Sequence, residues 1–319
     1  MSQNSSDKPL SGRVAIVTGG GQSLGRSHAL RLAEVGAKVL VNDLGAEVGG
    51  EGSDVSRAEA VAAEIRAMGG NAVSNTDSVA SLAGGRKIVQ AALDAFGRVD
   101  ILVNNAGVLR PNLIFDVTDE DIDLTLDVHM RGTFALAIAV APHFREQRSG
   151  VIINTGSEAG LGHYGNSIYS AAKEGIAGFT RTIARDFGPH GVRANLIRPA
   201  AMSRQATNSR NQELIIEAEK VYGFKSSADY WLTEILGDNL TPEHVSDFIV
   251  WLCTDEAAHI NGCDFRVMGG EISLLAEPHP IRTVYRDERW TIDALNKPSV
   301  AGNLYGHLRN KYLDKRREK

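Results

Sequence analysis

The first regular element of the chain begins with the stretch Arg13-Val14-Ala15-Ile16-Val17-Thr18-Gly19-Gly20-Gly21-Gln22-Ser23-Leu24-Gly25. Its first six residues form an apolar run typical of a buried strand, and a helical pattern follows from residue 23 to residue 35. The glycines between them allow a tight turn and a close approach to a pyrophosphate, which would rest on the helix N-terminus. The stretch predicts a nucleotide-binding strand–turn–helix, with a plain strand-to-helix turn as the alternative.

Short β-rich runs alternate with longer helical patterns along the rest of the chain. The runs expected to form strands are 38–42, 71–75, 99–103, 150–154, 193–197 and 263–267. The patterns expected to form helices are 58–68, 85–96, 119–145 and 168–187. Strands rich in Val, Ile and Leu, separated by helices, imply a parallel sheet covered on both faces. The predicted fold class is α/β: a Rossmann-type doubly wound parallel sheet in a single domain, followed by a C-terminal extension.

Length, composition and charge narrow the kind of protein. At 319 residues the chain fits one large domain or two small ones, and its net charge of -5 argues against a nucleic-acid or anionic-membrane partner. Cys253 and Cys263 are too few for a secreted disulfide framework, or for a metal site without clustered histidines. No stretch approaches the ~20 apolar residues of a membrane span. We therefore expect a cytoplasmic protein with no membrane span, no metal and no nucleic-acid partner.

Asp43 stands at the end of the second expected strand. A carboxylate at this place accepts hydrogen bonds from the ribose hydroxyls of an adenosine and repels a 2′-phosphate. Asp43 therefore favours NAD over NADP as the cofactor. The alternative is an aspartate in a solvated turn before Leu44-Gly45.

Tyr169 and Lys173 stand four residues apart in Tyr169-Ser170-Ala171-Ala172-Lys173, shortly after Ser157. One helical turn places side chains at i and i+4 on the same face. Because a nearby ammonium favours the ionised form of a phenol, this pair can take a proton from an alcohol or return one to a ketone. Alone, such a pair is more often surface packing. The nucleotide-binding stretch in the same domain is what favours an oxidoreductase.

Several short motifs together resemble the short-chain dehydrogenase/reductase family over residues 11–270. They are Thr18-Gly19, Asp77 after the third strand, Asn104-Asn105-Ala106-Gly107 after the fourth, and Ser157, Tyr169 and Lys173. Within the family the chain is most similar to the dehydrogenase part of the multifunctional type 2 enzymes, described as (3R)-hydroxyacyl-CoA and hydroxysteroid dehydrogenases. The stretches that carry this closer resemblance include Val41-Asn42-Asp43-Leu44-Gly45, Val128-His129-Met130-Arg131-Gly132 and Trp251-Leu252-Cys253.

The resemblance implies roles for individual residues. Tyr169 would be the general acid/base, Lys173 would lower its pKa and hold the nicotinamide ribose, and Ser157 would polarise the substrate oxygen. The residues implied to bind the cofactor are Gly19, Gln22, Ser23, Leu24, Gly25, Asp43, Asp77, Ser78, Val79, Asn105, Ala106, Gly107, Tyr169, Lys173, Pro199 and Ser203. Family members usually assemble as homodimers or homotetramers, so we expect a homo-oligomer.

Three positions depart from the family pattern. The middle glycine of the glycine loop is Ser23 here, which is tolerable if its backbone does not need a positive φ. The fourth catalytic position, an asparagine in most relatives, holds His129, which could support a water or proton relay or stabilise a kink in the long helix. Ser157 precedes Tyr169 by twelve residues, one fewer than usual, so the family spacing points to Gly156. We expect the missing residue to lie in the loop 161–166, which leaves Ser157 as the active serine.

The expected catalytic domain, residues 11–273, includes a segment that follows the sixth strand, residues 205–239. We expect this segment to be a helical lid that suits an apolar substrate and excludes water, or alternatively a subunit contact. Its aromatic residues are Tyr222, Phe224, Tyr230 and Trp231. His163 and Tyr164 are further candidates for the substrate wall, with ordinary loop packing as the alternative.

The two ends of the chain differ in character. Residues 1–10 are polar, lack the apolar core of a signal sequence and are expected to form a disordered tail. Residues 274–319 carry four aromatic side chains and are expected to cross a neighbouring subunit or to cover the active-site mouth. Their basic end, residues 315–319, could meet the phosphates of a CoA thioester or be a solvated helix end.

Three functions compete on the sequence alone. The first is NAD-dependent oxidation of a 3-hydroxyacyl-CoA, including a steroid side-chain thioester. The second is oxidation of a free hydroxysteroid or another cyclic alcohol. The third is a non-catalytic, NAD-sensing binding protein, against which the complete set of Ser157, Tyr169 and Lys173 argues.

Overall fold

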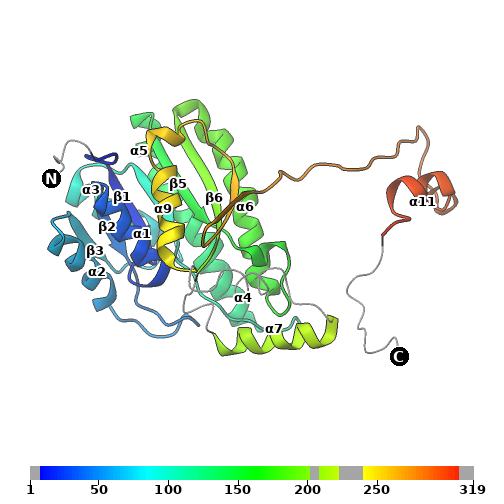
Figure 1. Ribbon diagram of the computed structural model, residues 1–319, viewed down its shortest axis with the longest axis horizontal. Helices are drawn as coiled ribbons and strands as arrows, with labels where there is room; N and C mark the ends of the chain where they lie inside the picture. The colour runs from blue at the N-terminus through cyan, green and yellow to red at the C-terminus, as the bar shows by residue number, and fades with distance from the viewer. Residues whose placement is uncertain (1–7, 202–207, 223–239, 309–319) are drawn as a thin grey trace.

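An eight-stranded sheet forms the centre of the structure, a computed structural model that describes residues 8–201, 208–222 and 240–308 (Figure 1). Its strand order is β3-β2-β1-β4-β5-β6-β7-β8, and only β8 runs antiparallel to its neighbour. The strands are β1 (Val14–Thr18), β2 (Lys38–Asn42), β3 (Ala72–Asn75), β4 (Ile101–Asn104), β5 (Gly150–Thr155), β6 (Val192–Ala200), β7 (Asp264–Met268) and β8 (Glu271–Leu274). The expected doubly wound Rossmann-type sheet is confirmed; the hairpin strand β8 is an addition to it.

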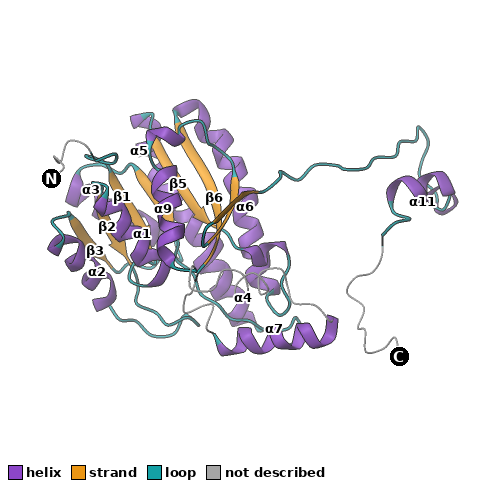
Figure 2. Cartoon of the chain, viewed as in Figure 1, coloured by secondary structure: helices purple, strands orange, loops and turns teal. Residues whose placement is uncertain are grey.

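Helices cover both faces of the sheet (Figure 2). On one face lie α1 (Ser23–Glu34), α2 (Ser56–Ala67) and α9 (Pro242–Leu252), and on the other α3 (Leu82–Phe96), α5 (Gly132–Gln147) and α6 (Ser167–Phe187). Since side chains alternate along a strand, Ala15 and Val17 of β1 pack toward the first set and Ile16 toward the second. This double burial explains why the strands are apolar throughout.

The order of the strands positions the site. The chain leaves β3 at one edge of the sheet and returns to place β4 beside β1, so the connections after β1 and β4 turn to opposite faces. A crevice opens between them at the carboxyl ends of the strands, where doubly wound sheets bind their ligands. The glycine-rich stretch after β1 borders this crevice.

The long helix expected over residues 119–145 is interrupted. It consists of α4 (Asp119–Leu126), a π-helical turn (Asp127–Arg131) and α5. Among the described residues this run, Asp119–Gln147, alone is long and apolar enough by length and composition to cross a membrane. Half of its most apolar window is buried inside the protein, because α5 packs against α3 and the sheet as a core helix.

The structure corrects the expected boundaries of the domain. Leu10, assigned above to a disordered tail, is fully buried, and its backbone N–H donates to the Val35 oxygen over 3.0 Å. Its apolar side chain joins the core, so the ordered domain begins before residue 11. At the other end β8 extends the sheet to Leu274.

The C-terminal extension leaves the body of the protein as an arm (Figure 1). Its described part, residues 275–308, carries two short helices, α10 (Ile292–Leu295) and α11 (Pro298–Leu304). Ile281, Tyr285 and Ile292 are at least 78% exposed. The arm therefore presents apolar side chains with no cover from its own domain.

Candidate active site

A cleft of about 390 Å³ lies at the carboxyl ends of the strands. It brings together nearly all residues predicted from the sequence: Gly19, Gln22, Ser23, Leu24, Gly25, Asp43, Asp77, Ser78, Val79, Asn105, Ala106, Gly107, Ser157, His163, Tyr169, Lys173 and Pro199. Three predicted residues cannot be placed in it. Ser203 and Trp231 lie outside the described residues, and Tyr222 ends α7 (Ser209–Tyr222) with a side chain that is not described.

Glycines shape the floor of the cleft. Gly19 has a φ of 62°, and a Cβ there would lie 2.8 Å from the Cα of Ala106. A Cβ on Gly25 would lie 2.0 Å from the Gly19 oxygen. Side chains at these positions would collide with backbone, so the loop and α1 pack without them. The result is a backbone cradle at a helix N-terminus, which suits a pyrophosphate.

A serine at position 23 was expected to be tolerable only if its backbone did not need a positive φ, and that condition is not met. Its φ is 46°, in the left-handed region, so the position does call for the conformation that glycine adopts freely. A non-glycine residue there is strained by about 1–2 kcal/mol. Ser23 begins α1 and lines the cleft, so the strain lies within the cofactor cradle.

Thr18 ties the glycine loop to the end of β4. Its Oγ1 accepts hydrogen bonds from the backbone N–H groups of Asn105, over 3.0 Å, and Ala106, over 3.1 Å. The Asn105 side chain in turn donates to the oxygens of Thr18 and Gly19. These bonds satisfy backbone N–H and C=O groups of the loops that have no partner in the sheet. They also fix the two sides of the crevice relative to each other.

Asp43 faces the glycine loop from the end of β2. Its two oxygens accept from the N–H of Gly21 over 2.8 Å and of Gly45 over 2.7 Å. Arg57 lies next to it, because a Cβ on Gly21 would come within 3.0 Å of both side chains. The Arg57 guanidinium is bonded to Glu47, Asp54 and a backbone oxygen of the same loop. This end of the cleft is therefore lined by the Asp43 carboxylate, while the charge of Arg57 is already paired.

A second polar network holds the loop after β3. Asn42 donates to the Asn75 side chain over 2.8 Å and to the Asp77 backbone oxygen over 2.9 Å. The Asp77 N–H donates to the Asn75 side chain over 3.0 Å. Residues 77–79 are thereby turned into the cleft, where an adenine would lie.

Ser157, Tyr169 and Lys173 converge at the other end of the cleft. The Lys173 ammonium donates to the Thr155 oxygen over 2.8 Å and lies 5.6 Å from the centre of the Tyr169 ring. Ser157 caps the short helix that follows it, its Oγ accepting from the Ala159 N–H over 3.1 Å. Its hydroxyl also forms a hydrogen bond with the Tyr169 phenol. Ser157, and not Gly156, thus supplies the hydroxyl beside the tyrosine.

Burial controls the proton affinities of this group. It raises the pKa of Tyr169 to about 12, and the Ser157 hydrogen bond opposes that rise. It lowers the pKa of Lys173 to about 7. With the protein groups by themselves the net shift of the Tyr169 pKa is therefore upward, and the expected lowering by Lys173 stays a prediction.

His129 lies behind the cleft, not in its lining. Its Nε2 contacts both backbone atoms of Val108, the oxygen over 2.8 Å, and its ring stands edge-on to the Tyr169 ring, with the ring centres 5.2 Å apart. Nδ1 is buried without a partner among the described residues. Burial lowers the pKa of His129 to about 3, so the imidazole stays neutral. The π-helical turn of residues 127–131 and these contacts support the role in shaping the helix, and a neutral ring could still hold a water.

The substrate side of the cleft is lined by two asparagines that the sequence did not single out. The Asn166 side chain donates to Asn211 of α7 over 3.1 Å and contacts His163 Nδ1 over 2.9 Å. Tyr164 instead bonds Glu217 of α7 through its hydroxyl. No metal site accompanies them: within residues 8–201, 208–222 and 240–308, no cluster of three His, Cys, Asp or Glu side chains could hold a metal ion.

Arg198 is the other residue that sequence reasoning missed. It is 1% exposed, and its guanidinium binds both oxygens of Asp264, the Glu174 carboxylate and the backbone oxygen of Ser157. An arginine next to the apolar residues Leu196 and Ile197 of β6 was the available signal, because such a charge needs partners when buried.

Comparison with known proteins agrees with this geometry. The chain is 39% identical over 276 residues to the peroxisomal multifunctional enzyme type 2 of Mus musculus, of which the match spans about a third (34%). It is 34% identical over 287 residues, 87% of the chain and 84% of the relative, to the hydroxyacyl-CoA dehydrogenase ChsB1 of Mycobacterium tuberculosis.

A solved structure shows the same arrangement. It is a short chain dehydrogenase from Mycobacterium avium, 36% identical, with a TM-score of 0.77 over 95% of this chain and 97% of that one. The family model for short chain dehydrogenases matches residues 13–215, which contain the glycine loop, Asp43, Ser157, Tyr169 and Lys173. The cradle, the serine–tyrosine–lysine group and these matches together lead to one conclusion: the chain belongs to the short-chain dehydrogenase family.

Proposed function

We propose that the protein is an NAD-dependent dehydrogenase that interconverts a secondary alcohol and a ketone. The observation that carries the proposal is the convergence of Ser157, Tyr169 and Lys173 at one end of a cleft whose other end is bordered by Asp43. A proton-transfer group and a dinucleotide cradle in one cleft are what hydride transfer from an alcohol needs.

Each side chain of the group has a task. The Tyr169 phenol exchanges the proton of the substrate hydroxyl, since it stands on α6 with its ring toward the cleft. The Ser157 hydroxyl accepts from Ala159 and lies beside the Tyr169 phenol, so its proton can turn to the substrate oxygen as charge develops there. Lys173, buried and anchored to the Thr155 oxygen, places an amine beside the phenol, and that amine is a cation below its lowered pKa of about 7. When bound, NAD accepts the hydride and brings a positive charge that favours the phenolate.

NAD fits the adenosine end better than NADP. A 2′-phosphate would meet the Asp43 carboxylate, and like charges in contact cost several kcal/mol. Arg57, which lies beside Asp43, is already paired with Glu47 and Asp54. A carboxylate at this position suits two ribose hydroxyls instead.

We assign the substrate to the 3-hydroxyacyl-CoA class. The Asn112–Asn166 bridge sets the loop after β4 beside the loop before α6, at the mouth of the cleft. Ile114, Phe115 and Leu161 on these loops are 61%, 90% and 60% exposed. Exposed apolar side chains on the two segments that this bridge joins suit an acyl chain. One of the relatives named above, the hydroxyacyl-CoA dehydrogenase ChsB1, carries the name of that class. A free hydroxysteroid is the alternative, because a sterol would suit the same apolar side chains.

The test measures NADH formation from NAD with each member of a substrate panel. The panel contains medium-chain and steroid side-chain 3-hydroxyacyl-CoA thioesters, the same acids without CoA, free hydroxysteroids and simple secondary alcohols. We expect turnover with NAD on the thioesters and its loss when CoA is removed. Turnover on free sterols alone would replace the substrate class, and NADH binding without turnover on any member would favour the sensor function.

We further propose that the protein works as a homo-oligomer in which the arm packs on a second copy. Helices of four and seven residues are far below the ~12–15 residues that an isolated helix needs in water, so α10 and α11 require a partner surface. Their own domain does not provide it (Figure 1). A second copy is the partner present wherever the chain is, and homo-oligomers are the commonest assemblies.

A further inference from the structure

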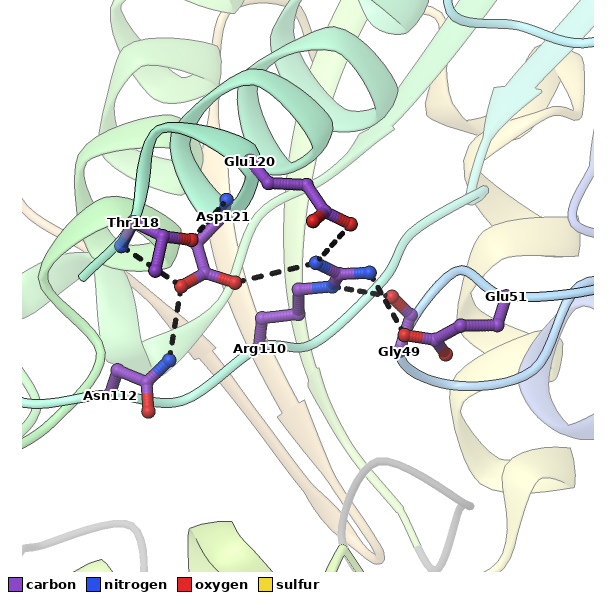
Figure 3. Close-up of polar contacts among 7 residues, drawn as sticks. All are labelled: Gly49, Glu51, Arg110, Asn112, Thr118, Glu120 and Asp121. Carbon is purple, nitrogen blue, oxygen red and sulfur yellow. Dashed lines mark hydrogen bonds and ion pairs between the residues drawn. The ribbon is translucent and has the colours of Figure 1, made fainter. Parts of the chain in front are cut away.

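Arg110 joins three separate segments next to the cleft. It follows β4, and its Nε donates to the Gly49 oxygen over 2.7 Å (Figure 3). Its two terminal nitrogens bond Glu51 over 2.9 Å, Glu120 over 2.9 Å and Asp121 over 3.5 Å. Gly49 and Glu51 belong to the loop between β2 and α2, whereas the two other carboxylates lie in the first turn of α4.

The α4 end of this junction is fixed. Asp121 is only 10% exposed in its side chain, and it accepts hydrogen bonds from the Thr118 N–H and the Asn112 side chain, each over 3.1 Å. The Arg110 side chain is 17% exposed, whereas Glu51 and Glu120 are 66% and 77% exposed. Since exposed ion pairs contribute little, the part-buried contacts with Asp121 and the Gly49 oxygen dominate.

The segment at the other end, residues 44–55, is the loop that continues from Asp43. Ala46, Glu47, Val48 and Gly50 of this loop line the cleft. Besides Arg110, one backbone bond holds it across the crevice, from the Leu109 N–H to the Val48 oxygen over 2.8 Å. The loop contains Gly45, Gly49, Gly50 and Gly52, which make it costly to order.

We propose that Arg110 is a positioning residue for cofactor binding, which holds the β2–α2 loop as a preformed wall beside the adenosine end of the cleft. Arg110 itself does not line the cleft and acts only through the loop. Without it, the loop would have to be ordered when the dinucleotide binds, and that ordering would weaken binding. The inference rests on the proposed use of NAD.

The test compares Arg110→Met with the wild-type enzyme. NADH affinity is measured directly by fluorescence titration without substrate, and KM for NAD, KM for the alcohol and kcat are measured separately. We expect NADH to bind about tenfold more weakly, KM for NAD to rise in parallel, and kcat at saturation to change less than about twofold. Arg110→Lys, which reaches fewer of the acceptors, should fall between the two.

Arg31→Met is the matched control. Arg31 also bridges two segments, joining Glu34 of α1 to Asp247 of α9, but it lies outside the cleft lining. Thermal unfolding of both variants separates a general loss of stability from a loss of affinity. We expect the control to leave NADH affinity unchanged even where it lowers the melting temperature.

A second variant attacks the loop while keeping the arginine. Gly50 has a φ of 95°, and a Cβ there would lie 2.7 Å from a Leu124 methyl group, so Gly50→Ala displaces the same wall. Its effect on affinity should not add to that of Arg110→Met, because both act through one loop.

Two results would overturn the inference. The first is a folded Arg110→Met variant with wild-type NADH affinity. The second is a variant in which kcat and both KM values change together, which indicates general distortion. Failure of the wild-type enzyme itself to bind NADH would instead reject the proposed cofactor, so the two failures are distinguishable.

Discussion

The guanidinium of Arg198 donates a hydrogen bond of 2.8 Å to the backbone oxygen of Ser157. The same guanidinium binds Glu174, the residue after Lys173, and Asp264 of the neighbouring strand β7. One buried arginine therefore fixes the strand end that carries the serine relative to the helix that carries the tyrosine and the lysine. Because Arg198 lies in β6, the sheet fixes the relative positions of these reacting groups more than the loops do.

Arg198→Met should harm both stability and turnover. Removing one partner of a buried ion cluster leaves Asp264 uncompensated, which typically costs about 3–5 kcal/mol. We expect a lower urea midpoint, and a fall in kcat with little change in NADH affinity, because Ser157 loses its anchor and the cradle does not. Arg198→Lys should keep more stability than activity, since an ammonium cannot reach all three acceptors. A folded variant with normal kcat would show that the contact is structural only.

Asp43→Ser should relax the choice of cofactor. The change removes the charge that opposes a 2′-phosphate and leaves Arg57 beside that position, so the ratio of kcat/KM for NAD over NADP should fall by about 100-fold or more. The kinetic ratio measured with both cofactors is the readout. Glu47→Gln serves as control, because it alters the charge near Arg57 without touching Asp43. An unchanged ratio in Asp43→Ser would remove Asp43 from the specificity argument.

Ser23→Gly should stabilise the protein despite adding a flexible residue. It relieves a left-handed backbone at φ 46°, which is worth about 1–2 kcal/mol, while the extra freedom of the unfolded chain takes back about 0.5–1 kcal/mol. We expect a net gain of up to ~1.5 kcal/mol in urea unfolding. Ser23→Ala, which keeps the strain and loses only the hydroxyl, is the control and should give no gain.

Acid should weaken the fold through its buried histidines. Burial lowers the pKa of His28, and of His129, to about 3, well below the unfolded value near 6.5. The contribution of the two histidines to the free energy of unfolding is complete above pH ~6.5 and is lost as the pH falls toward 3. The reason is that the unfolded chain binds protons on these histidines in this range and the folded chain does not. Each histidine should remove about 2 kcal/mol between pH 6.5 and pH 5. His28→Asn, which can keep a polar contact with Ser246, should flatten this dependence, and an equally steep slope would contradict the assignment.

Tyr169→Phe should reduce turnover by about 1000-fold or more, while NADH should still bind. In the wild-type enzyme, alcohol oxidation should accelerate with rising pH because burial holds the pKa of Tyr169 at about 12 and the reaction needs the phenolate. Lys173→Met should shift that rise to still higher pH. Rates measured from pH 6 to pH 10 with saturating cofactor test both statements, and unchanged turnover in Tyr169→Phe would reject the mechanism.

Short local patterns predicted the parts of the site that depend on local backbone. The glycine loop, Asp43 and the Tyr169–Lys173 pair each lie at the end of a strand or on one helical turn, so sequence spacing translates directly into geometry. The alternation seen in β1 likewise follows from the period of a strand. The structure confirms the sheet and brings these residues together in one cleft, while their roles stay predictions.

What could not be predicted depends on contacts between distant segments. Arg198 and Arg110 gain their meaning from carboxylates far along the chain, and Leu10 is buried only because α1 ends beside it. The positive φ of Ser23 is set by the packing of the loop, and no preference of serine reveals it. The π-helical turn at His129 has the same origin, since its ring must reach Val108.

The exposed arm would make part of the fold depend on protein concentration, which an isolated catalytic domain would not show. If the order of α10 and α11 depends on a second copy, the last part of the chain folds in a step whose extent depends on protein concentration. Trp290, in the arm, is 37% exposed in the single chain and would lose that exposure on docking. The fluorescence of Trp290 therefore offers a signal for assembly that is separate from cofactor and substrate binding in the cleft.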